Sequence, residues 1–232
     1  MTKFITKFDT TSDFAAFSAT TDFGRPHVSL TADDSKIHYF GDAYNEPEYV
    51  DLGLPSGLKW ATCNVGASSP EQAGLYFAWG ETTGYTAKQV TSGVRKFTMD
   101  VYDTGPAASI SSDITLEQDA AHANLGGNWR MPNQNEYREL FNNCNAMWTT
   151  NYNGTGVKGR VFMSNVNGNS VFFPASGSAD DRRMSNVGKT GCYWSSSKIG
   201  GTNNYQLFFN SSIQNISSSS GWYGFSVRGV FK

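Results

Sequence analysis

The C-terminal run, residues 193–230, constrains the fold of this chain more than any other segment. It consists mainly of Ser, Asn, Gly, Thr, Ile, Gln and Tyr, and it contains no Asp or Glu. The run has no helical period. Aromatic and apolar residues nevertheless bracket it, with Tyr193 and Trp194 at its start and an alternating apolar pattern over 224–227 at its end. A disordered polar tail would lack such anchors. We therefore expect ordered segments on a rigid scaffold, where binding residues gather.

The composition favours strands and turns over long helices. Of the 232 residues only 16% are charged, whereas 14% are aromatic and 24 are glycine. Long helices normally need Lys and Glu on their surfaces. The net charge of −2 provides no basic field for phosphates, so nucleic acid is not an expected partner. No apolar run approaches the ~20 residues of a membrane span, so no membrane insertion is predicted.

Residues 1–46 are predicted to form a small separate module. A short helix is expected over 14–17, followed by a β-hairpin of strands 25–30 and 37–40 around the turn 33–36. Such a piece buries too little to be stable alone, so it is expected to dock on the main domain, a second copy or a larger assembly. The N-terminus has no continuous apolar segment, and no signal peptide is predicted.

Residues 47–232 are predicted to form the main domain. Strands are expected over 58–65 and 75–80, and residues 82–113 are expected to be a long surface insertion of turns. One helix is predicted over 115–123 with Ser112 or Asp113 as its cap, and a second is predicted to begin after Pro132. A brief strand is expected over 148–150, and strands 157–163 and 170–174 are expected to form a hairpin around Asn167-Gly168.

Several motifs resemble a known family. They are YVDLGLPSGLKWATCNVGASSPEQAGLYFAWGET (49–82), GGNWRMPNQNEYRELFNNC (126–144), FFPASG (172–177), YWSSS (193–197) and GFSVRGV (224–230). In this order they resemble the major-paralogous-domain family of Bacteroidetes surface and phage proteins, which is related to the formylglycine-generating-enzyme branch of the C-type lectin fold. The resemblance covers roughly residues 49–232. It implies an α+β, C-type-lectin-like domain with two helices, small antiparallel sheets and much irregular loop.

The final segment is similar to that of a more specific group of proteins, the variable proteins of diversity-generating retroelements. These proteins end in a repeat rich in AAY codons, which adenine-directed mutagenesis scatters among Asn, Ser, Gly, Thr, Ile, Tyr and a few others. Residues 193–197 and 224–228 match the constant flanks of such a repeat. Four residues between the flanks cannot arise from AAY codons and need other template codons: Lys198, Gln206, Gln214 and Trp222.

The resemblance implies a variable ligand-binding surface over about 198–223. Leu207 and Phe209 are predicted to point inward, and Gln206 and Phe208, which alternate with them, are predicted to point outward. Tyr205, Phe208, Trp222 and Tyr223 are expected to contact the ligand, because aromatics among small polar residues are typical of recombined binding sites. The predicted surface comprises Ile199, Gly200, Thr202, Asn203, Tyr205, Gln206, Phe208, Ile213, Gln214, Asn215, Ile216, Ser217, Ser219, Gly221, Trp222 and Tyr223.

Other residues of chemical interest are expected to be structural. Trp60, Trp79, Trp129 and Trp194 are predicted to lie in the core, and Arg130 and Arg228 are predicted to form partly buried structural ion pairs rather than anion sites. The three cysteines, Cys63, Cys144 and Cys192, are odd in number and widely spaced, which favours buried free thiols with at most one disulfide.

The sequence therefore predicts a binding protein and not an enzyme. No Ser-His-Asp arrangement or reactive cysteine pair is evident, and no cofactor or metal is expected. The absence of acids after Tyr193 disfavours a calcium-dependent lectin. The expected partner is a protein or glycan receptor on a target cell. The expected setting is a phage tail-fibre tip in a virion, with several copies, such as a trimer; the alternative is a fixed bacterial surface adhesin or carbohydrate-binding lectin.

Overall fold

The structure is a computed structural model that describes residues 27–30, 37–40, 47–105, 107 and 109–232. The chain divides into two compact units, Met1–Glu46 and Pro47–Lys232. In the first unit β1 (His27–Leu30) pairs antiparallel with β2 (Ile37–Phe40), which confirms the predicted hairpin. The helix predicted over 14–17 and the turn predicted over 33–36 lie outside the described residues.

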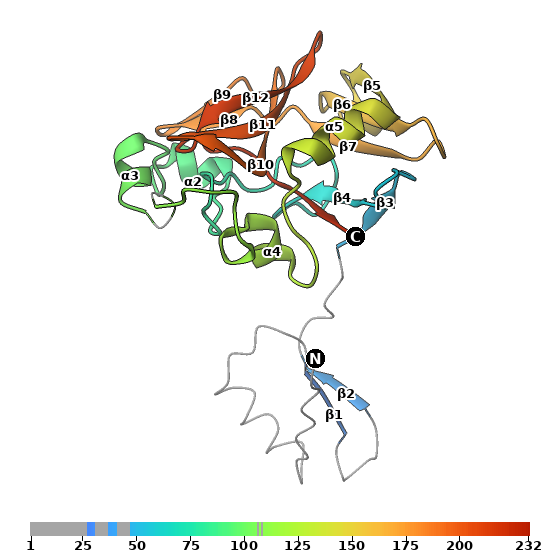
Figure 1. Ribbon diagram of the computed structural model, residues 1–232, viewed down its shortest axis with the longest axis horizontal. Coiled ribbons are helices and arrows are strands. Elements are labelled where there is room, and N and C mark those ends of the chain that lie inside the picture. The colour runs from blue at the N-terminus through green and yellow to red at the C-terminus, as the bar shows by residue number, and fades with distance from the viewer. Residues whose placement is uncertain (1–26, 31–36, 41–46, 106, 108) are drawn as a thin grey trace. The chain divides into compact units, whose positions relative to one another are not determined.

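The second unit is an α+β domain with four small antiparallel sheets (Figure 1). One has the strand order β13-β4-β3, with β3 at Tyr49–Asp51, β4 at Lys59–Asn64 and β13 at Arg228–Phe231. Another has the order β5-β6-β7, with strands Cys144–Thr149, Gly159–Ser164 and Ser170–Pro174. β8 (Ser178–Asp180) pairs with β9 (Arg183–Ser185). The C-terminal sheet has the order β10-β11-β12, with strands Gly191–Gly200, Asn203–Phe209 and Gln214–Ser220.

The longest helix in the described part of the chain is α5 (Gln134–Asn143), which begins where the sequence predicted. The Asn133 side chain accepts hydrogen bonds from the N–H groups of Asn135 and Glu136, and the Glu136 carboxylate accepts from the N–H of Asn133. This reciprocal capping box satisfies N–H groups that a helix start leaves unpaired. Glu136 also pairs with Arg130 at 2.5 Å, so the structural ion pair predicted for Arg130 is confirmed.

The other predicted helix is broken in two. A 3₁₀ turn, η1 (Leu116–Gln118), comes first, and α4 (Ala120–Leu125) starts anew after Asp119. The cap of α4 is therefore Asp119 rather than Ser112 or Asp113. Its carboxylate accepts from the N–H groups of His122 and Met131, so it ties the helix start to the segment that leads into α5. Burial raises the pKa of Asp119.

The predicted surface insertion is folded and contributes to the core. It contains α2 (Ala87–Thr91), capped by a Thr86–Gln89 capping box, and α3 (Met99–Asp103). Val90, Phe97 and Tyr102 are buried. The domain thus has more helices than the two predicted, because isolated apolar residues in turn-rich sequence were interpreted as a loop.

Three strand predictions have different outcomes. The hairpin predicted around Asn167-Gly168 is confirmed by the antiparallel pair β6–β7. The strand predicted over 75–80 is wrong, because this segment makes only isolated bridges, Tyr76 with Tyr85 and Phe77 with Phe225. The strand expected over 148–150 is longer and starts earlier, since β5 follows α5 without a connection.

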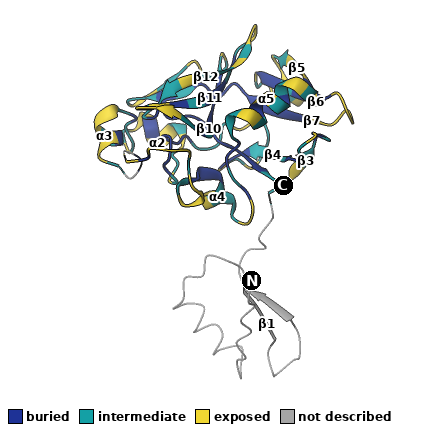
Figure 2. Ribbon diagram, in the orientation of Figure 1, coloured by how far each residue is buried: buried dark blue, intermediate teal, exposed yellow. Residues whose placement is uncertain are grey.

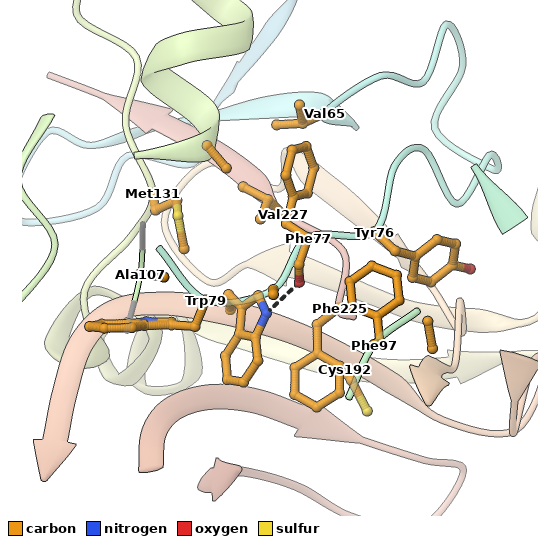
Figure 3. Close-up of a cluster of buried hydrophobic side chains, with 14 of the residues drawn as sticks. Val65, Tyr76, Phe77, Trp79, Phe97, Ala107, Met131, Cys192, Phe225 and Val227 are labelled. Carbon is orange, nitrogen blue, oxygen red and sulfur yellow. Dashed lines mark hydrogen bonds between the residues drawn. The ribbon is translucent and has the colours of Figure 1, made fainter. Parts of the chain in front are cut away.

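Two clusters of buried side chains form the core, and β10 contributes to both. Cluster 1, drawn in Figure 3, includes Tyr76, Phe77, Trp79, Phe97, Trp194, Phe225 and Val227. Cluster 2 includes Trp60, Tyr137, Leu140, Phe162, Phe173, Tyr193, Leu207 and Phe209. The four tryptophans predicted to be core are buried. Trp194 Nε1 donates to Phe77 O and Trp79 Nε1 to Ser195 O, both at 2.8 Å, so both indoles tie β10 to the segment around residues 77–79.

Arg228 is fully buried where three sheets meet. Its guanidinium donates, at 2.6 to 2.9 Å, to Asn64 Oδ1, Ala61 O, Thr62 O and Phe172 O. It also lies 4.6 Å from the centre of the Phe173 ring. No carboxylate among the described residues pairs with it. The ion pair predicted for Arg228 is therefore wrong, and main-chain carbonyls stabilise the charge instead.

Replacement of Arg228 is expected to destabilise the domain strongly. Arg228→Met leaves buried oxygens of β4 and β7 without a donor, so the free energy of unfolding should fall by about 3 kcal/mol. Urea denaturation followed by tryptophan fluorescence measures the change. The control is Arg138→Met on the exposed face of α5, which should shift stability by less than about 0.5 kcal/mol. Equal effects of the two substitutions would contradict this account.

Candidate functional site

The polar C-terminal run, for which the sequence predicted ordered segments, is a three-stranded antiparallel meander. β10 pairs with β11 and β11 pairs with β12. The chain then returns to its starting point: Trp194 N–H donates to Ser226 O at 3.1 Å, and Tyr193 forms a parallel bridge with Ser226. Hydrogen bonds inside the domain core thus hold both ends of the run.

The predicted inward positions of β11 are confirmed. Leu207 and Phe209 are fully buried in cluster 2. The Phe209 ring stacks on Tyr193 with centroids 6.0 Å apart. Gly191, which pairs with Phe209, leaves space for that ring, because a Cβ at Gly191 would lie 2.1 Å from a ring carbon. The buried side chains of Leu207 and Phe209 therefore fix the register of β11.

The predicted outward positions of β11 are not solvent-facing. Gln206 is 6% exposed and sits opposite Trp194, and Phe208 is half-buried against cluster 1. Gln206 Oε1 has no hydrogen-bond partner in the described part of the chain. Alternation correctly separated the two faces of β11, but it could not show that the second face is also covered.

The aromatic pair at the end of the run belongs partly to the core. Trp222 and Tyr223 are half-buried and pack against cluster 1, and Tyr223 stacks on Phe225 with centroids 6.0 Å apart. Gly221 is buried, and a Cβ there would lie 2.5 Å from Tyr102 Oη. Its carbonyl accepts from Trp79 N–H. Gly221 therefore has no room for a side chain, and its prediction as a contact residue is wrong.

The remaining predicted positions lie on both faces and in the turns of the C-terminal sheet, and they are half-buried or exposed (teal and yellow in Figure 2). Exposed are Ile199, Gly200, Asn203, Ile213 and Asn215. Half-buried are Thr202, Tyr205, Gln214, Ile216, Ser217 and Ser219. Two of these also make structural contacts, because Arg160 Nη1 donates to Gln214 Oε1 at 2.8 Å and Ile216 packs against cluster 2.

Sequence reasoning omitted four exposed positions within the same C-terminal run: Gly201, Ser211, Ser212 and Ser218. Ser and Gly are both reachable from AAY codons, so their composition would have been a sufficient signal. Lys198, which is not among the predicted contact residues, makes structural contacts: its Nζ lies 4.9 Å from the centre of the Trp79 ring and its N–H donates to Asp113 Oδ1.

The cysteines are free thiols. Cys144 and Cys192 are buried and Cys63 is half-buried. Burial raises the pKa of both Cys144 and Cys192 to about 11, so neither thiol is ionised at neutral pH. Within the described ranges, no group of His, Cys, Asp and Glu could hold a metal ion, and no helix is long and apolar enough to cross a membrane.

Comparisons with known proteins add no relative: no protein-family model, curated protein or solved structure matches the chain. The chemistry of the site thus rests on its own geometry. That geometry is an uncharged, partly aromatic surface on the antiparallel sheet β10-β11-β12, both ends of which are held by the core.

Thiol labelling is expected to separate the cysteines. In the native protein at pH 8, iodoacetamide should modify Cys63 at least tenfold faster than Cys144 or Cys192, because the buried pair lacks thiolate and access. Peptide mass spectrometry measures the three rates. In urea all three should react alike. Native labelling of Cys192 as fast as Cys63 would contradict the buried, protonated state.

Proposed function

We propose that this chain is a non-enzymatic binding protein with a C-type-lectin-like fold. Its C-terminal sheet displays an exchangeable surface over residues 198–223 to a protein or glycan receptor on a target cell. The observation that carries the proposal is the pattern of burial between the two held ends of the run. Leu207 and Phe209 anchor the middle strand, whereas exposed side chains such as Asn203 and Asn215 extend from the same sheet.

The residues that AAY codons cannot encode support diversification of this surface. Each of the four has a structural contact: Lys198 lies over Trp79, Gln206 is buried, Gln214 binds Arg160, and Trp222 packs against cluster 1. Exposed positions such as Asn203, Asn215 and Ser218 carry residues that AAY codons can become. A mutagenic process confined to AAY codons would thus leave these contacts intact while it changes the accessible side chains.

A virion, with the chain at a phage tail-fibre tip, is the proposed setting, and a bacterial cell surface is the second. A surface whose residues change is not optimised for any one target, so a single site would bind weakly. Several copies in one assembly would add avidity by raising the effective concentration of the second contact.

The diversification claim has a direct test in the neighbouring DNA. We expect a reverse-transcriptase gene and a near-copy of the segment that encodes residues 193–230, differing from it mainly at adenines. Sequencing of the locus measures this. A locus with neither element would leave a fixed adhesin or lectin in place of a diversified one.

Exchangeability is testable on the protein. In a displayed library that randomises exposed positions (Ile199, Asn203, Ile213, Asn215, Ser218), most variants should stay folded, since exposed substitutions usually shift stability by less than about 0.5 kcal/mol. Selection on an arbitrary protein such as lysozyme should then yield binders. The matched control library randomises Asn204, Gln206, Leu207 and Phe209, and most of its variants should unfold. Equal tolerance in both libraries, or no binders, would refute the proposal.

A further inference from the structure

β12 is an edge strand with a free row of main-chain groups. Among the described strands it pairs with β11 alone, in unbroken register from Asn203–Ser220 to Phe209–Gln214. The hydrogen bonds that flank the ladder, Asn210 N–H to Ile213 O and Gly221 N–H to Thr202 O, set the alternation. They place the N–H and C=O groups of Asn215, Ser217 and Ser219 toward β11, and those of Gln214, Ile216, Ser218 and Ser220 toward the outside.

Those outward groups have almost no partners. Ser220 O accepts from Tyr223 N–H at 3.2 Å. For Ile216 and Ser218, no other described residue supplies a donor or acceptor to the outward N–H or C=O. Ser218 is exposed and Ile216 is half-buried, so a binding partner can reach this edge.

The opposite edge of the same sheet is closed by the chain itself. Along β10, hydrogen bonds run from Trp194 N–H to Ser226 O, from Ser196 N–H to Pro132 O, from Ile114 N–H to Ser196 O and from Lys198 N–H to Asp113 Oδ1. Other sheet edges are closed by side chains: Arg228 donates to Phe172 O and Tyr193 to Pro174 O on β7, and Arg160 donates to Ala146 O on β5. The C-terminal sheet thus has a closed edge at β10 and an open edge at β12 in the described part of the chain.

β12 also lacks the features by which proteins protect edge strands. Natural edges are usually short, or carry Lys, Pro or a bulge. β12 has seven residues, QNISSSS, with no charge and no proline, and its register with β11 has no shift. By contrast, β10 has two register shifts, and β3 has three residues, the last of them Asp51.

We propose that the free edge of β12 binds an extended segment of a partner polypeptide, which pairs with it as a fourth strand. This inference rests on the proposed function, and of the two proposed receptor classes, protein and glycan, it selects protein. Strand addition takes its affinity from main-chain hydrogen bonds, and pockets for alternate side chains add specificity. Such bonds do not depend on side-chain identity, so an exchangeable surface keeps a constant source of affinity at Ile216 and Ser218.

The register defines the chemistry of the added strand. Its side chains on one face lie beside Ile216 and Ser218, with Tyr205 behind them as the partner of Ser218 across the ladder. On the other face they lie beside Asn215, Ser217 and Ser219. We expect an uncharged strand with β-branched or aromatic residues on the first face and small polar residues on the second.

A second copy of this chain is a less suitable occupant. Two β12 strands, each ~23 Å long at ~3.3 Å per residue, would bring together mainly small side chains. They would bury far less than the ~1,200 Å² of a stable interface. A partner strand with larger side chains gains contacts with Ile216 and Tyr205 that a run of serines does not.

The test uses the full chain and a phage-displayed library of random nine-residue peptides. Selected peptides should alternate as described. The matched variants are Ser218→Ala, which keeps the outward N–H, and Ser218→Pro, which removes it on an edge that tolerates proline. We expect peptide affinity to change less than about threefold for Ser218→Ala and to fall about tenfold or more for Ser218→Pro. Urea denaturation checks that both variants are folded.

Two measurements on the unaltered protein are independent of that substitution. Peptide binding should slow amide hydrogen exchange at Ile216 and Ser218. N-methylation of the peptide at one alternate set of residues should abolish binding, and methylation of the other set should not. Failure to select any peptide, or peptides insensitive to N-methylation, would overturn strand addition and leave the proposed function to its own DNA and library tests. The free chain could instead form concentration-dependent dimers that Ser218→Pro abolishes. That result would assign the β12 edge to a second copy of this chain and would also overturn the proposed binding of a partner strand.

Discussion

The buried guanidinium of Arg228 is the interaction on which the architecture depends. From the last strand it reaches carbonyls of β4 and β7 and the side chain of Asn64. Asn64 Nδ2 in turn donates to Tyr193 Oη, which donates to Pro174 O. Burial lowers the pKa of Arg228, and transfer of a lone cation into the interior is costly unless its donors are satisfied. This network around Arg228 therefore forms only when the sheets that contain β4, β7 and β10 are all in place. It couples β13, the last strand, to Tyr193 at the start of the C-terminal sheet.

That coupling explains how the C-terminal sheet can be rigid at its β10 edge and open at its β12 edge. Tyr193 and Trp194, adjacent on β10, enter different core clusters, so both faces of the strand are held. β11 receives this rigidity through Leu207 and Phe209. β12 receives it through pairing with β11 and through two side chains, Ile216 against cluster 2 and Gln214 bound to Arg160. Burial falls in the same order, and no residue of β12 is buried. Freedom to vary thus increases with distance from the core, strand by strand.

Local signals in the sequence predicted the elements that local interactions build. The Pro132-Asn133 start of α5, the turn at Asn167-Gly168 and the inward side chains of Leu207 and Phe209 were all readable. Elements that depend on distant partners were not. A run of serines has little intrinsic preference for a strand, so β12 exists because β11 lies beside it. Gln206 was misplaced because alternation distinguishes two faces without showing that both are covered. Asp119 was missed because its second partner, Met131, lies beyond the helix that it caps.

The hydrogen bond between Trp194 and Ser226 has a consequence for evolution of the chain. The segment from β10 to β12 begins and ends at neighbouring points, and between its strands it has turns that do not enter the core, so the length of each turn does not affect the positions of the two ends. Closing a longer flexible loop costs only about 0.6 kcal/mol for each doubling of its length. The turns at 201–202 and 210–213 could thus gain or lose residues without a change in the core. The binding surface can then evolve by insertions and deletions in these turns as well as by substitutions.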